Sequence, residues 1–205
     1  MAEAVVDPTT GRALVELAGR TLAAATARVP EGQPPAAPTT PRALTEPGAA
    51  FVTLQRDGRL RGCIGSLEAH RPLAEDVIAN ARAAALEDPR FPPLEPGELP
   101  GLHIEVSVLS APAPFPFSDE ADLLARLRPG VDGLILEAGP VNRGTFLPAV
   151  WQSLPDPRDF LTELRRKAGL PGDYPLTKTR LSRYTTHAFG GIIRDTSGAI
   201  RPDAA

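Results

Sequence analysis

The sequence predicts a protein that combines helices with β-hairpins. Two pairs of strand-like runs are each joined by a turn-forming segment, as is typical of hairpins. Other stretches repeat apolar residues at intervals of three and four, as amphipathic helices do. One further run, residues 102–109, alternates apolar and polar side chains in the manner of a half-buried strand.

The N-terminal half gives reasons for two helices and one hairpin. Asp7 and Pro8 are typical of a helix start, and Pro30 ends that helix. Asp57-Gly58 lies between two strand-like runs, which favours a hairpin turn. The elements expected here are a helix from Asp7 to Pro30, an extended Pro-rich connection over residues 30–48, strands over residues 49–55 and 59–65, and a helix over residues 72–86. The connection is interpreted either as a strap over the core or as a hinge between domains.

The C-terminal half is predicted in the same way. Gly139 and Pro140 separate two short apolar runs and indicate a second hairpin, and Gly169 closes a helix. The elements expected here are a strand over residues 102–109, a short helix over residues 118–127, strands over residues 133–137 and 144–147, a helix over residues 157–168 and a last strand over residues 180–189.

The composition of the 205 residues excludes several classes of protein. A single cysteine and three histidines support neither a disulfide scaffold nor a structural zinc site. No apolar run reaches the roughly 20 residues of a membrane-spanning helix, and residues 1–30 carry acids where a signal peptide would be cationic and then apolar. The net charge of −3 lacks the basic excess of nucleic-acid-binding proteins. We therefore expect a soluble, cytoplasmic protein with no metal, cofactor, membrane or nucleic-acid partner.

Cys63, the only thiol, is the first candidate for chemistry. In an extended strand it shares a face with Arg61, about 7 Å away at the backbone, and a guanidinium at that range favours the nucleophilic thiolate. Gly62 and Gly65 leave the backbone bare for a ligand to approach. The alternative is that Cys63 is an inert, buried small hydrophobe.

Other polar residues are candidates with equally plain alternatives. Glu105 and Ser107 interrupt an apolar strand, so they line either a polar pocket or a solvated sheet face. Asp88 can accept backbone donors and Arg90 can reach an anion, although a turn alone explains both. His103 lies on the polar face of the same strand as Glu105 and could serve as a base for a thiol; His70 is a second such histidine, and either is equally a cap or a surface residue.

Several short stretches of the sequence form an ordered set of motifs. The first is Leu60-Arg61-Gly62-Cys63-Ile64-Gly65, preceded by Phe51-Val52-Thr53-Leu54. The others are Asp88-Pro89-Arg90-Phe91, Ile104-Glu105-Val106-Ser107-Val108-Leu109, Gly133-Leu134-Ile135-Leu136, Thr145-Phe146-Leu147-Pro148 and Lys167-Ala168-Gly169-Leu170. In this order the motifs resemble those of the AMMECR-domain family, whose prokaryotic members are called AmmeMemoRadiSam system protein A. The resemblance covers nearly the whole chain, and the ordered set is highly specific.

The resemblance implies an α+β fold with a mixed or antiparallel sheet and packed helices. It implies that this larger part packs against a smaller subdomain, with the hexapeptide strand near the cleft between them. We place the domain over residues 1–195 and the smaller subdomain within residues 70–130, and we expect residues 196–205 to be a disordered tail. The resemblance also implies two partners, a Memo-like protein and a radical S-adenosylmethionine enzyme.

Two functions are consistent with the residues that match the family. Those residues are Arg61, Gly62, Cys63, Gly65, Asp88, Arg90, Glu105 and Ser107. In the first hypothesis the protein is an enzyme or enzyme component, with Cys63 as nucleophile, Arg61 holding its thiolate or an anionic substrate, and Glu105 as acid or base. In the second, the same face is a non-catalytic module that binds a nucleotide, a peptide or a partner protein.

Overall fold

The computed structural model describes residues 6–27 and 42–203. The chain forms two units: unit 1 takes in the residues up to Leu109 and from His187 onward, and unit 2 spans Ser110–Thr186. Each unit combines helices with a sheet of antiparallel strand pairs, so the expected α+β class is confirmed. The smaller subdomain expected within residues 70–130 overlaps unit 2 only over residues 110–130, because the chain leaves unit 1 after β5 and returns with β10.

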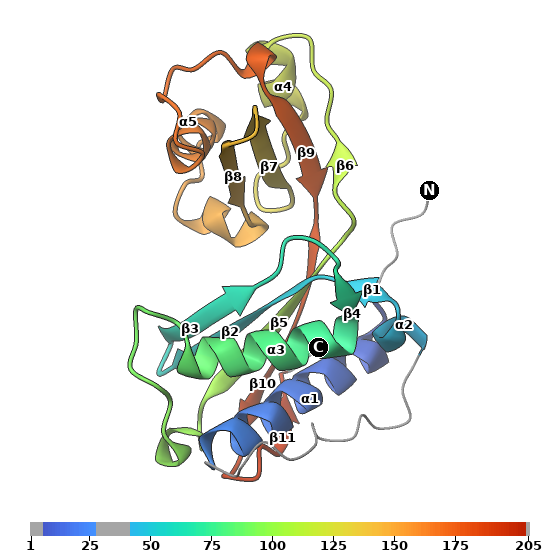
Figure 1. Cartoon of the computed structure of the whole chain (residues 1–205), viewed down its shortest axis with the longest axis vertical. Coiled ribbons are helices and arrows are strands. Elements are labelled where there is room, and N and C mark those ends of the chain that lie inside the picture. The colour runs from blue at the N-terminus through green and yellow to red at the C-terminus, as the bar shows by residue number, and fades with distance from the viewer. Residues whose placement is uncertain (1–5, 28–41, 204–205) are drawn as a thin grey trace. The chain divides into compact units, whose positions relative to one another are not determined.

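Unit 1 is built on a five-stranded sheet. Its elements are α1 (Pro8–Thr26), α2 (Arg42–Thr45), β1 (Pro47–Gly48), β2 (Ala50–Arg56), β3 (Arg59–Gly65), β4 (Arg71–Pro72), α3 (Leu73–Leu86), a 3-10 turn (Pro96–Glu98), β5 (His103–Leu109), β10 (Thr186–Ile193) and β11 (Ile200–Pro202). The strand order is β11-β10-β5-β2-β3, which makes β3 an edge strand. Helices α1 and α3 pack against each other, α3 on β2 and β3 and α1 on β5 (Figure 1).

The two faces of this sheet differ because strand side chains alternate. Val52 and Leu54 of β2 and Ile104 and Val106 of β5 are fully buried and belong to one core with the helices. The residues between them are only half-buried. The alternation predicted for residues 102–109 is confirmed, and it sets a polar face opposite the core.

A buried carboxylate ties α3 to the sheet. Asp76 is 1% exposed, and its oxygens accept hydrogen bonds from the Ala50 amide at 2.9 Å and from the Ser66 hydroxyl at 2.7 Å. Arg71 Nε and Asn80 Nδ2 donate to it as well, each at 2.9 Å. A buried charge is tolerated when it is fully hydrogen-bonded in this way, so Asp76 fixes where α3 begins on β2.

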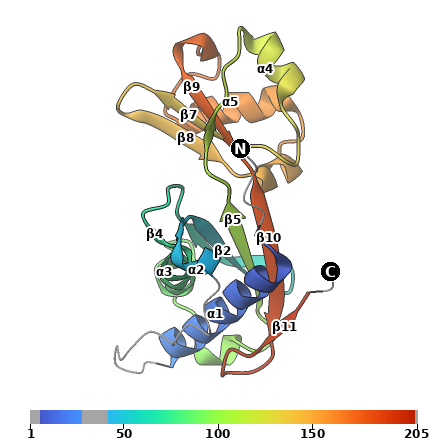
Figure 2. The same ribbon diagram turned by 90° about the vertical axis from the view of Figure 1, so that its right-hand side faces the viewer.

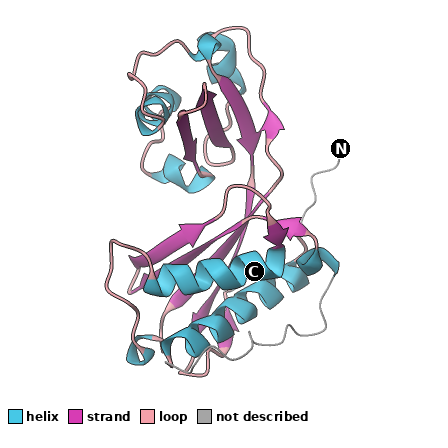
Figure 3. Ribbon diagram, in the orientation of Figure 1, coloured by secondary structure: helices cyan, strands magenta, loops and turns pink. Residues whose placement is uncertain are grey.

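Unit 2 has its own sheet and core. Its elements are β6 (Ala113–Pro114), α4 (Glu120–Arg126), β7 (Gly133–Ala138), β8 (Asn142–Phe146), a 3-10 helix (Pro148–Gln152), α5 (Pro157–Lys167), a 3-10 turn (Leu176–Lys178) and β9 (Arg180–Tyr184). The antiparallel strands follow the order β6-β9-β7-β8 and are accompanied by α4 and α5 (Figures 2 and 3). Phe160 stacks on Trp151 at a centroid distance of 3.8 Å in the middle of this core.

Most predicted elements are confirmed, and the differences lie near the chain ends. Both hairpins form, and the helices predicted around residues 72–86 and 157–168 are α3 and α5. The strand predicted over residues 180–189 is two strands, β9 and β10, which belong to different sheets. The expected tail over 196–205 carries β11, which pairs with β10. Of the Pro-rich connection expected over residues 30–48, residues 30–41 lie outside the described residues, and the remainder carries α2 and β1 instead of one extended run.

Candidate functional site

Cys63 lies in the middle of edge strand β3 and is half-buried. In the hairpin register it faces Thr53 of β2, whose hydroxyl donates a hydrogen bond to Cys63 Sγ at 3.4 Å. Gly62, the preceding residue, faces α3, so the alternation of the strand turns Cys63 away from the helices. The thiol therefore belongs to the polar face of the sheet rather than to the core.

The polar face carries the sequence-predicted Glu105 and Ser107 in register with this pair. Thr53 faces Cys63 on one side and Glu105 of β5 on the other, so these three residues form one row across three strands. The Ser107 hydroxyl donates to Glu105 Oε1 at 3.1 Å. The structure thus brings Cys63, Glu105 and Ser107 onto one surface, with Thr53 between the thiol and the carboxylate.

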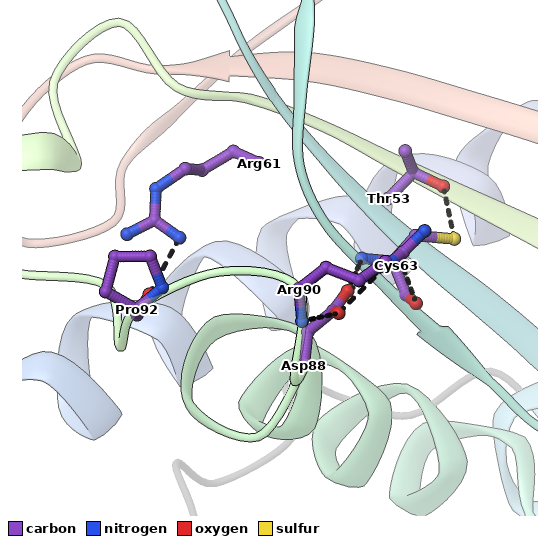
Figure 4. Close-up of polar contacts among 6 residues, drawn as sticks. All are labelled: Thr53, Arg61, Cys63, Asp88, Arg90 and Pro92. Carbon is purple, nitrogen blue, oxygen red and sulfur yellow. Dashed lines mark hydrogen bonds and ion pairs between the residues drawn. The ribbon is translucent and has the colours of Figure 1, made fainter.

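Arg61 does not contact the Cys63 sulfur in the way its spacing suggested. Its Nε and Nη2 each donate to the Glu98 carboxylate at 2.9 Å, and its Nη1 donates to the Pro92 carbonyl at 2.9 Å. The Arg61 hydrogen bond also lowers the pKa of Glu98. In Figure 4 the Arg61 side chain extends toward Pro92 and away from Cys63. Glu98, 37 residues later in the chain, binds the guanidinium instead.

Asp88 and Arg90 are the residues that hold Cys63 (Figure 4). Asp88 Oδ2 accepts the Cys63 amide hydrogen at 2.9 Å, and Arg90 Nη2 donates to the Cys63 carbonyl at 3.3 Å. Arg90 also donates hydrogen bonds to the Asp88 carboxylate, from Nε at 2.9 Å and from Nη2 at 2.7 Å. The Arg90 hydrogen bond holds the pKa of Asp88 well below its usual range, despite an opposing contribution from burial, and the Cys63 amide adds to the lowering.

The two motif glycines have a packing reason. A Cβ on Gly62 would lie 2.2 Å from the Ala84 carbonyl oxygen of α3, and a Cβ on Gly65 would lie 2.2 Å from the Phe51 ring. Neither position has room for a side chain. The glycines thus allow α3 and Phe51 to approach β3, which accounts for them without a ligand.

The candidate bases sit apart from the thiol. His103 Nε2 lies 2.8 Å from an Asp203 carboxylate oxygen, and His70, an exposed residue, lies 3.4 Å from Glu68. Among the described residues no group of three or more His, Cys, Asp or Glu side chains is arranged to hold a metal ion. A hollow of about 420 Å³ lies at the hairpin tip and is lined by Arg56, Asp57, Arg59, Leu60 and Arg61, so Cys63 is not one of its lining residues.

Sequence reasoning missed Thr53 and Glu98. A regular hairpin around the Asp57-Gly58 turn would pair Thr53 with Gly62. Thr53 pairs with Cys63 because the register shifts by one residue between Leu54 and Gln55. Glu98 lies in a 3-10 turn that only the tertiary fold brings to Arg61. No local pattern marks it.

Comparisons with known proteins agree with this structure. A model of the AMMECR1 family matches residues 15–189. A protein of Methanothermobacter thermautotrophicus is 44% identical over 145 residues, 68% of this chain and 73% of its own. A protein of Saccharolobus islandicus is 40% identical over 168 residues, 79% of this chain and 70% of its own. The crystal structure of an uncharacterised protein from Pyrococcus horikoshii has a TM-score of 0.82 and 35% identity, and covers 98% of this chain and 99% of its own.

Over residues 6–27 and 42–203, no helix is long and apolar enough to cross a membrane.

Proposed function

The chain belongs to the AMMECR1 family, and we propose that it is a component of a Memo-like and radical S-adenosylmethionine-associated system in which Cys63 acts as a nucleophile. The observation that carries the proposal is the 3.4 Å hydrogen bond from the Thr53 hydroxyl to Cys63 Sγ on the polar face of the sheet. A hydroxyl donor favours the thiolate, which is the nucleophilic form. A half-buried thiol remains within reach of a substrate.

Arg90 takes the part first given to Arg61. Each of the two arginines binds a carboxylate, but Arg90 Nη2 also lies 3.3 Å from the Cys63 carbonyl oxygen, and the Arg90 side chain is 54% exposed whereas that of Arg61 is 13% exposed. The hydrogen bond to Asp88 raises the pKa of Arg90. A guanidinium beside the sulfur stabilises the thiolate and attracts an anionic substrate.

The proposed step is attack by the Cys63 thiolate on an electrophilic carbon of a small molecule or a biomolecule. A carbon–sulfur bond forms, and the leaving group departs with its electron pair. Glu105 is two strands from Cys63, about 9.6 Å at the backbone. That separation suits Glu105 to exchange a proton with the leaving group of a bound substrate rather than with the thiol.

Alkylation of Cys63, the only thiol of the chain, tests this proposal. Thr53→Val should slow the reaction with iodoacetamide, because the donor to Sγ is lost. Arg90→Gln should lower the ratio of iodoacetate to iodoacetamide rates about fivefold, the effect of a unit charge about 4 Å from the reagent in water. Matched controls are Ser107→Ala, a hydroxyl bonded to Glu105, and Arg61→Gln. Equal effects of each variant and its control would contradict the assignment.

The system and the compartment are proposed on the family resemblance. We expect the protein to act in the cytoplasm, on a compound that the Memo-like protein and the radical enzyme also handle. Metabolites should be compared among strains that lack this gene, lack either partner gene, or carry Cys63→Ser. The same compound should accumulate in all four strains. If each strain accumulated a different compound, the proposal that this protein belongs to the system would be contradicted.

A non-catalytic binding module is the second candidate. It is favoured by the exposed Arg90 guanidinium beside the Phe91 ring, 5.5 Å from its centroid, which is a surface suited to an anionic or aromatic ligand. Cys63→Ser distinguishes the two functions, because a binding module keeps its cellular role without the sulfur and a nucleophile does not.

A further inference from the structure

The outer edge of β3 is covered by side chains instead of by another strand. β3 is the last strand of its sheet, and an edge strand presents backbone N–H and C=O groups that pair readily with another chain. Here the Cys63 amide hydrogen is bound by Asp88 and the Cys63 carbonyl by Arg90. This side-chain pair therefore makes the two hydrogen bonds that the backbone of a neighbouring strand would make.

Residues 88–98, the segment that carries Asp88 and Arg90, also contact β3 at Arg61, two residues before Cys63. Arg61 donates to the Pro92 carbonyl at 2.9 Å, to the Pro93 carbonyl at 3.4 Å and to both oxygens of Glu98 at 2.9 Å. Both guanidinium groups lie close to the Phe91 ring, at 6.0 Å from its centroid for Arg61 and 5.5 Å for Arg90. The contacts of Arg61 run between β3 and residues 88–98, and the contact of Arg90 with Phe91 lies within that segment.

The covering segment is also anchored to the core of unit 1. Leu94, 3% exposed, belongs to that core and donates its amide hydrogen to the Ala85 carbonyl of α3 at 2.8 Å. Leu99, which follows the segment, is 1% exposed in the same core. The segment is thus held at the strand by polar contacts and at the helix by buried apolar ones.

We propose that residues 88–98 are an edge guard, which keeps β3 from pairing with β3 of a second copy of this chain. An antiparallel pair of identical edge strands has twofold symmetry, so a second copy supplies a complementary surface with no further adaptation. Asp88 and Arg90 block this pairing, because they bind both the backbone N–H and the backbone C=O of Cys63. The inference stands apart from the chemistry proposed for the Cys63 sulfur.

The test is the association state of guard variants. Asp88→Ala removes the acceptor of the Cys63 amide and the anchor of Arg90, and Arg90→Gln removes the donor to the Cys63 carbonyl. In sedimentation over a range of concentrations, both variants should shift from the mass of the wild-type chain toward twice that mass. Arg59→Gln is the matched control, because Arg59 is an exposed arginine of the same strand that lies outside the guard, and it should sediment as the wild type does.

A second measurement keeps the test decisive if Asp88→Ala folds poorly. A labelled peptide with the sequence of residues 59–65, with serine in place of the cysteine, should bind folded Arg90→Gln and leave the wild type unbound. Guard variants that are folded, keep the wild-type mass and ignore the peptide would overturn the proposal. Unchanged Cys63 alkylation in the same variants would instead bear on the proposed nucleophile, so the two failures can be told apart.

Discussion

Arg61 and Arg90 both lie close to the Phe91 ring, and each binds different partners. Arg61 is 13% exposed and bound at both outer nitrogens and at Nε, so it fastens a loop. Arg90 is 54% exposed and rests on the Cys63 peptide. Both side chains bind a carboxylate through Nε and Nη2, so the difference between them lies in their exposure and in the loop carbonyls of Pro92 and Pro93 that Arg61 binds in addition.

Asp88 should make the stability of the protein sensitive to acid. Its pKa is lowered in the folded state, first by the Arg90 hydrogen bond, so its contribution is present above the unfolded value of about 3.9 and is lost as pH falls through the folded value. At pH 7, Asp88→Ala should lower the free energy of unfolding by about 1–3 kcal/mol. Urea titrations at pH 7 and near pH 3 should show the difference between the two proteins shrinking in acid. A difference independent of pH would refute the charged role of Asp88.

At this scale the sequence predicts what is local. The place of Glu105 and Ser107 on one face of their strand follows from the two-residue period of a strand, and that part of the site was predictable. That Cys63 shares this face depends on the register of β3, β2 and β5, which is set by the fold. The partner of a long charged side chain is set by the tertiary fold instead. The spacing in the strand predicts Arg61 near the thiol, whereas no local pattern predicts Glu98, which binds Arg61 from a later loop.

Helix α3 is joined to the sheet by the Asp76 network as well as by apolar packing. Asp76→Ala should cost about 3 kcal/mol of unfolding free energy, because it leaves the buried Ala50 amide and Asn80 side chain without their acceptor. Amide hydrogen exchange should rise at the start of α3 and in β2. Glu75→Ala is the matched control, since Glu75 is an exposed acid in the same turn. A cost no larger than that of Glu75→Ala would show that apolar packing alone places the helix.

Among the elements, hairpins and capped helices were predictable because their determinants are a few residues apart. The β2–β3 and β7–β8 pairs carry their turns between them, and Asp156 caps α5 by accepting the Arg158 amide. The boundary between β9 and β10 was missed because the extended pattern continues across Thr185 while the pairing partner changes. β11 was not predicted because a strand of three residues has little pattern of its own and forms by pairing with β10.

The two units carry one natural probe each. Trp151, the only tryptophan, lies in unit 2, and Cys63, the only cysteine, lies in unit 1. Phe160→Ala empties the centre of the unit 2 core and should lower the stability of that unit by about 3–5 kcal/mol. In urea, the Trp151 fluorescence transition should move to lower concentration while the transition in Cys63 labelling stays in place. Equal displacement of both transitions would mean that the units unfold together.

The interruption of unit 1 by unit 2 also has a consequence for synthesis on the ribosome. Strand β5 is made before unit 2 and its neighbour β10 after it, so β5 lacks that neighbour while all of unit 2 is being translated. Unit 2 is one continuous segment and can fold as soon as it emerges. Unit 1 is finished last, and a nascent chain stalled before residue 186 would carry the Cys63 motif on a sheet that is still missing two of its strands.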